Sequence, residues 1–154
     1  ILIFIYIVMK LRFIFLGKKN TSFLDLLIKE YLKRLNKYVK SEYIFIDEKN
    51  SVKLEQKIIK QVKSRDYMIV LDEKGQTFTT VEYAKLLKKT LINCSSIIFI
   101  VGDAYSVPKS ISTHANTIFS LSKMTFPHMI ARLIILEQTY RSFCILNNHP
   151  YHHE

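Results

Sequence analysis

The chain of 154 residues is long enough for one domain with one core, and its apolar content of 49% is ample to fill that core, which excludes a disordered chain. Lysine and arginine number 23 against 13 acidic residues, and the net charge of +10 favours a polyanionic partner such as RNA, DNA or an anionic membrane surface. Ordinary lysine-rich helices in a basic proteome are the alternative explanation of that charge.

The first eight residues, ILIFIYIV, form an apolar run that is interrupted early by Lys10 and Arg12. A membrane span needs about 20 apolar residues, and a secretory signal needs a basic region and a small-residue cleavage site, so neither is expected here. Met9 opens a native-like start, MKLRFIFLGK. We therefore expect residues 1–8 to be an extension or a misplaced start, and residues 9–154 to form a single cytoplasmic domain without a membrane partner.

Short β-like runs alternate with amphipathic helices along the chain. Strands are predicted at 11–16, 43–47, 67–72, 96–102 and 116–122, and the turn EKGQ follows the third of them. Helices are predicted at 21–38, 51–64, 79–91, near 107–112 and at 128–146. This alternation predicts an α/β fold with a mostly parallel sheet and flanking helices.

Several common kinds of site are excluded by what the chain lacks. Its three glycines form neither G-x-G-x-x-G nor a P-loop, so a Rossmann dinucleotide site and a P-loop nucleotide site are not expected. No His/Cys cluster has the spacing of a structural zinc site, so no metal is expected. Cys94 and Cys144 are predicted to be buried thiols of a reducing cytosol, and a disulfide between them is unsupported.

Three strand ends are the candidate ligand site. In open α/β sheets, ligands bind beyond the carboxyl ends of the strands, which here are Leu71–Asp72, Gly102 and the stretch 120–128. That stretch, SLSKMTFPH, supplies hydroxyls, a cation and an apolar wall from Ser122, Lys123, Met124, Thr125 and Phe126. Such a loop could hold a flat heteroaromatic ring, and an ordinary strand-to-helix connection is the alternative.

The closing helix carries apolar side chains around much of its circumference. Ile135 shares a face with Arg132 and Thr139, whereas Ile130 and Ile134 lie toward a different side. A helix that is apolar on several sides is deeply buried or lies in a subunit interface. We expect a homodimer, because one domain of this size can hardly bury a whole helix.

The segments SKMTFPH, EQTYR and HPYH resemble the ribosomal RNA large subunit methyltransferase H family, of the SPOUT class, and the resemblance runs from Met9 to the C-terminus. It implies a C-terminal trefoil knot and the use of S-adenosyl-L-methionine to methylate N3 of a pseudouridine in a 23S rRNA hairpin loop of the ribosome. The implied cofactor contacts are Leu71, Gly102, Leu121, Ser122, Lys123, Met124, Thr125 and Phe126.

Two departures from the family pattern concern its glycines and its C-terminus. Asp103 and Ser106 stand where the family usually has glycine, which predicts a stiffer or reshaped loop after Gly102. His153 stands where the family usually has arginine or lysine, and a neutral imidazole offers phosphate no positive charge.

Catalytic and RNA contacts are assigned to the remaining polar residues. Candidates for accepting the N3 proton are His128, Tyr151 and His152, with helix capping or packing as the alternative role of His128. The expected RNA contacts are Lys18, Lys19, Lys33, Arg34, Arg132, Arg141 and His153. Two alternative functions stay open: a SPOUT methyltransferase acting on tRNA, and a non-enzymatic basic RNA-binding module.

Overall fold

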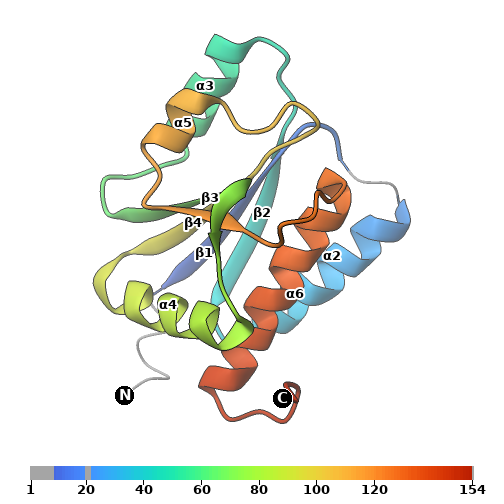
Figure 1. Ribbon diagram of the computed structural model, residues 1–154, viewed down its shortest axis with the longest axis vertical. Coiled ribbons are helices and arrows are strands. Elements are labelled where there is room, and N and C mark those ends of the chain that lie inside the picture. Colours follow the sequence, from blue (N-terminus) through green and yellow to red (C-terminus); the bar gives the residue numbers. More distant parts are fainter. Residues whose placement is uncertain (1–8, 20–21, 154) are drawn as a thin grey trace.

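A computed structural model describes residues 9–19 and 22–153, so the proposed extension 1–8 lies outside the described residues. Within these ranges five parallel strands form one sheet in the order β2-β1-β4-β3-β5 (Figure 1). The strands are β1 (Lys10–Leu16), β2 (Lys40–Ile46), β3 (Asp66–Thr77), β4 (Ser96–Val101) and β5 (Thr117–Ser120). The helices are α2 (Ser22–Leu35), α3 (Ser51–Ile59), α4 (Thr80–Asn93), α5 (Lys109–Thr113) and α6 (His128–Leu146). The predicted α/β architecture is confirmed.

The sheet separates two apolar layers, because successive side chains of a strand point to opposite faces. Phe13 of β1 and Phe99 of β4 face α2, α4 and α6, with their rings stacked at 4.6 Å. Ile14 and Ile100 face the smaller layer formed by α3 and α5. All four side chains are fully buried. The central strands are therefore apolar on both faces, as expected of a parallel sheet covered on each side.

β3 is longer than its sequence pattern indicates. The turn predicted at EKGQ does not end the strand, which continues to Thr77. Its pairing with β5 shifts register between Leu71 and Gln76, so the residues between them stand outside the ladder. The residues that leave the ladder include Asp72, Glu73 and Lys74, which form a wall at the carboxyl edge of the sheet, and the strand pairs with β5 again at Gln76 and Thr77.

The ends of the helices agree with the sequence where local chemistry defines them. Pro127 precedes α6, which spans the predicted 128–146. Thr79 and Glu82 form a reciprocal capping box at the start of α4. By contrast, α2 ends at Leu35 and α3 at Ile59, so both predicted helices were too long at their C-terminal ends. The trefoil knot stays a prediction.

Candidate functional site

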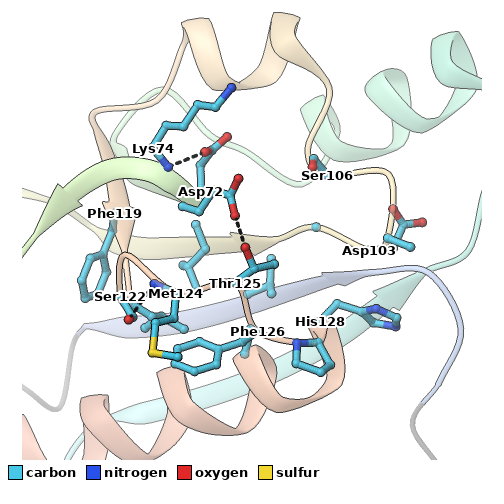
Figure 2. Close-up of a pocket in the computed structure, with 18 residues that line it drawn as sticks. Asp72, Lys74, Asp103, Ser106, Phe119, Ser122, Met124, Thr125, Phe126 and His128 are labelled. Carbon is cyan, nitrogen blue, oxygen red and sulfur yellow. Dashed lines mark hydrogen bonds between the residues drawn. The ribbon is translucent and has the colours of Figure 1, made fainter.

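The carboxyl ends of β3, β4 and β5 surround a cavity of about 500 Å³ (Figure 2). Its walls include Leu71 from β3, Gly102 after β4 and Phe119 from β5. The loop between β5 and α6 closes it with Leu121, Ser122, Met124, Thr125, Phe126 and Pro127. The structure therefore brings the three predicted strand exits together. Lys123 is the one predicted cofactor residue that does not line the cavity, and it is exposed.

Side-chain hydrogen bonds fix the path of the loop over the cavity. The Ser120 hydroxyl donates to the Ser122 carbonyl at 2.7 Å, and the Met124 N–H donates to the Ser122 hydroxyl at 3.0 Å. The Thr125 hydroxyl donates to the Glu73 carboxylate at 2.6 Å. The last bond ties the loop to the extended part of β3. Glu73 was missed by the sequence analysis, because the stretch around it was interpreted as an isolated turn.

Gly102 has no room for a side chain. A Cβ built there would lie 2.7 Å from the carbonyl carbon of Ser106 and 2.9 Å from the Val107 nitrogen. Both atoms belong to the backbone, so a rotamer change cannot relieve the contact. The turn folds tightly onto Gly102, and the Ser106 N–H donates to the Asp103 carbonyl at 3.0 Å.

Ser106 adopts the left-handed conformation, with φ of 68°. A non-glycine residue in this region carries strain of about 1 kcal/mol or more, because its Cβ approaches the following carbonyl oxygen. The loop thus keeps a conformation that suits glycine although the sequence places serine there.

Replacing Ser106 by glycine should raise the free energy of unfolding by about 0.5–1 kcal/mol, since it removes this strain. Urea denaturation followed by circular dichroism measures the change. The control is Ser110→Gly in α5, where φ is helical and glycine should lower stability by a similar amount. Equal destabilisation by both variants would show that the Ser106 conformation carries no strain.

His128 is the predicted catalytic residue that the structure places at the cavity. It begins α6, lines the cavity wall and is half-buried. Burial lowers the pKa of its imidazole, the nearby Arg132 lowers it further, and Asp103 opposes the effect. The ring is therefore neutral at neutral pH and can accept a proton.

Tyr151 and His152 lie far from this cavity in the same chain. The tail folds back onto the later part of α6, where Tyr151 contacts Glu137, nine residues and therefore about 14 Å along the helix from His128 (Figure 1). The Tyr151 hydroxyl donates to Glu137 at 3.2 Å, and its ring packs against Tyr140 at 4.8 Å. Burial, and then the hydrogen bond with Tyr31, raise the pKa of Tyr151 strongly. Its hydroxyl stays protonated at neutral pH and is a poor candidate for the base.

The structure contradicts one predicted RNA contact, that of Arg132. Its side chain is fully buried, so the expected surface contact with RNA is wrong. The guanidinium donates to the carbonyls of Leu16 and Lys18, where the chain leaves β1. It also lies over the rings of Phe15 and Phe45, with distances of 5.6 and 5.1 Å to their centroids. Arg132 therefore holds α6 against the carboxyl end of β1.

The other predicted RNA residues form two groups. Lys18 and Lys19 are exposed where the chain leaves β1, at the cavity edge of the sheet. The second group lies near the far end of α2 and α6 and consists of Lys33, Arg34, Arg141 and His153. Arg34 pairs with Glu30 at 2.8 Å and Arg141 with Glu137 at 2.6 Å, so these two cations are partly neutralised.

Residues 9–19 and 22–153 offer little support for a metal site or a membrane span. No group of three or more His, Cys, Asp or Glu side chains there is arranged to hold a metal ion. None of the helices described is both long enough and apolar enough to cross a membrane. Cys94 and Cys144 are free thiols, of which only Cys144 is fully buried.

The chain is similar to known proteins along almost its whole length. A family described as "Predicted SPOUT methyltransferase" matches residues 9–152. A protein of Parabacteroides distasonis is 38% identical over 157 residues, covering 95% of this chain and 100% of its own length. A Flavobacterium johnsoniae protein is 36% identical with the same coverage, and a Clostridium botulinum protein is 38% identical over 94% of this chain and 99% of its own. All three are named ribosomal RNA large subunit methyltransferase H. The chain belongs to the SPOUT methyltransferase family.

Proposed function

We propose that this protein is an S-adenosyl-L-methionine-dependent methyltransferase that modifies N3 of a pseudouridine in a 23S rRNA hairpin loop of the ribosome. The observation that carries the proposal is that Leu71, Gly102 and the loop after β5 line one cavity together, and these are cofactor contacts implied by the family. Relatives that match almost the full chain are named for methylation of large-subunit rRNA, which supports the substrate class.

The cavity suits the proposed cofactor in size and chemistry. Its volume lies within the range of about 300–1,000 Å³ typical of small-molecule sites. Leu71, Leu121 and Phe126 offer apolar walls for an adenine ring, and the absence of a side chain at Gly102 lets the turn through Ser106 pack closely at the cavity edge. When bound there, S-adenosylmethionine supplies an electrophilic methyl group.

The residues of the chain orient the partners and accept the proton. The loop 121–127, tied to β3 through Thr125 and Glu73, holds the cofactor and excludes water from one side. N3 must lose its proton on methylation, and the neutral imidazole of His128 at the cavity wall is the nearest proposed acceptor.

The tail with Tyr151 and His152 does not line the cavity of its own chain, and a homodimer would let it reach the cavity of a second copy. Phe23 and Leu26 on α2 are 71% and 65% exposed, and Ile130 on α6 is 36% exposed, so the cavity end of these helices presents apolar surface. In a dimer with a two-fold axis, the α2–α6 layers of the two copies would be antiparallel to each other. The tail of one chain, with Tyr151 and His152, would then approach the cavity of the other.

The proposed function predicts methyl transfer to ribosomes from a strain that lacks the endogenous enzyme. Radiolabelled S-adenosylmethionine, followed by digestion of the 23S rRNA and mass spectrometry, locates the methyl group. Ribosomes that lack the pseudouridine should be poorer substrates. Methylation of tRNA but not of ribosomes would support the alternative SPOUT activity, and binding of RNA without any cofactor binding would support the non-enzymatic module.

Substituting His128 by asparagine should lower kcat about 100-fold while the cofactor Kd changes little, because the proton acceptor is lost. In the wild type, kcat should fall in acid only at a pH under the ordinary imidazole value of about 6.5, since burial lowers the His128 pKa and protonation removes the acceptor. The pH–rate profile of ribosome methylation tests this. The control is His114→Asn on the exposed end of α5, which should keep the wild-type profile. If the pH–rate profile of His128→Asn matches that of the wild type, His128 has only a packing role.

Replacing Phe23 by aspartate should convert a dimer into a monomer, since a charge would be buried in the interface without a partner. Light scattering should give about twice the 18.2 kDa chain mass for the wild type and the single mass for the variant. Phe23 is a better choice than Ile135, which is fully buried in its own chain and whose substitution would damage the fold. Val52→Asp on the exposed face of α3 is the control, and a monomeric, fully active wild type would contradict the dimer.

A further inference from the structure

The cavity has acidic walls although the chain as a whole is strongly basic. Asp72, Glu73 and Asp103 line it, and Lys74 is the only lysine or arginine among the lining residues of the part that the structure describes. The chain carries 23 lysines and arginines, so a wall built from the average surface would be cationic. The sign of the charge is reversed at the place where the cofactor is proposed to bind.

Hydrogen bonds from neutral groups hold the carboxylates of Asp72 and Glu73 in position. Asp72 accepts a hydrogen bond from the Lys74 backbone N–H at 2.8 Å, and Glu73 accepts one from the Thr125 hydroxyl at 2.6 Å. Both donors are uncharged, and across residues 9–19 and 22–153 neither carboxylate forms an ion pair within 4.0 Å. The two carboxylates are therefore held in place by neutral donors and not by ion pairs.

Asp103 differs from the other two acidic residues. The Tyr105 N–H donates to its carboxylate at 2.8 Å, and the buried Arg132 lies close enough to interact with it electrostatically. Part of the Asp103 charge is therefore offset from within the protein. Asp72 and Glu73 remain as the pair of lining carboxylates for which the described residues provide no ion pair within 4.0 Å.

We infer that Asp72 and Glu73 make the cavity discriminate by charge between the methyl donor and its product. The inference rests on the proposed function. The donor has a positively charged sulfonium, whereas transfer of the methyl group leaves S-adenosylhomocysteine with an uncharged thioether. Two fixed carboxylates stabilise a cation in the cavity, but they give the neutral sulfur no comparable electrostatic stabilisation. The spent cofactor is thereby bound more weakly and is replaced by fresh donor.

The same two charges separate the cofactor from the RNA. Phosphate groups are attracted by the exposed lysines at the edge of the cavity, such as Lys18 and Lys19, and are repelled by the carboxylates within it. A basic surface around an acidic cavity lets one protein bind a cationic cofactor and a polyanionic substrate side by side.

Isothermal calorimetry on the full chain tests the inference with three ligands. S-adenosylmethionine and S-adenosylhomocysteine give the ratio of donor to product affinity, and sinefungin, which carries an ammonium-bearing carbon in place of the sulfonium, separates charge from the bulk of the methyl group. The variants are Asp72→Asn, Glu73→Gln and the double variant, because each amide keeps the acceptor oxygen used in the native hydrogen bond. Glu55→Gln on α3, outside the cavity, makes the same charge change as a control.

Each single variant should lower the donor-to-product affinity ratio about threefold and the double variant about tenfold, with sinefungin following the donor and Glu55→Gln unchanged. The Kd of S-adenosylhomocysteine should change less than twofold. A wild-type ratio in the double variant, with both ligands still bound, would overturn the inference and leave the proposed function intact. Failure of the wild type to bind either ligand would overturn both.

Discussion

Replacing Arg132 by alanine should lower the free energy of unfolding by about 4 kcal/mol. The side chain is fully buried, and its loss would strand the carbonyls of Leu16 and Lys18 without their donor. A buried acceptor without a partner raises the energy by about 1–3 kcal/mol, and the empty volume beside Phe15 and Phe45 adds a cavity term of similar size. Urea denaturation of the two proteins measures the difference.

Arg34→Ala is the matched control for this prediction. Arg34 also forms an ion pair and lies over an aromatic ring, at 5.2 Å from the Tyr31 centroid, but it is only half-buried. Its loss should lower stability by less than about 1 kcal/mol. A stable Arg132→Ala protein that has lost only RNA affinity would restore the surface role expected from the sequence.

Mixing two inactive variants should restore about a quarter of wild-type methyl transfer if the tail acts on the partner's cavity. Gly102→Val should abolish cofactor binding by at least about 100-fold, because its Cβ would collide with the backbone of Ser106 and force the loop out of shape. Deleting residues 150–154 should leave cofactor binding intact and abolish transfer. In a mixed dimer, the intact cavity of the truncated chain would receive the tail of the Gly102→Val chain.

The complementation experiment distinguishes a tail acting in its own chain from one acting across the dimer. A tail that served its own cavity would leave every mixed dimer without a complete site, and the mixture would stay inactive. Adding Phe23→Asp to both variants should remove the rescue by separating the chains. Circular dichroism of each variant before mixing confirms that the comparison is made between folded proteins.

The fold class followed from the sequence because its signals are local. Apolar runs such as SIIFIV, bounded by polar turns, predict buried parallel strands, and the closing helix was bounded by Pro127. The position of the ligand site followed from the rule that such sheets bind at their carboxyl edge. The order of the strands did not follow, since no local signal shows that β4 lies between β1 and β3.

The errors at the site have a common origin in contacts made far along the chain. Arg132 was expected at the surface because arginine is rarely buried. No residue near it in sequence indicates that it donates hydrogen bonds to the carbonyls of Leu16 and Lys18. Glu73 reaches Thr125 only because β3 and β5 are neighbours. Tyr151 was grouped with His128 by chemistry alone, whereas its hydroxyl contacts Glu137, more than two helical turns after His128.

The strand order also determines when the sheet can be completed as the chain leaves the ribosome. β1 pairs with β2 early, but its other neighbour is β4, and α3, β3 and α4 are all synthesised in between. At typical rates of translation, one edge of the apolar β1 therefore stays unpaired for several seconds until β4 is synthesised. The stacked rings of Phe13 and Phe99 cannot form before then. A nascent chain of this protein should consequently depend on chaperones that shield apolar segments until β4 has emerged.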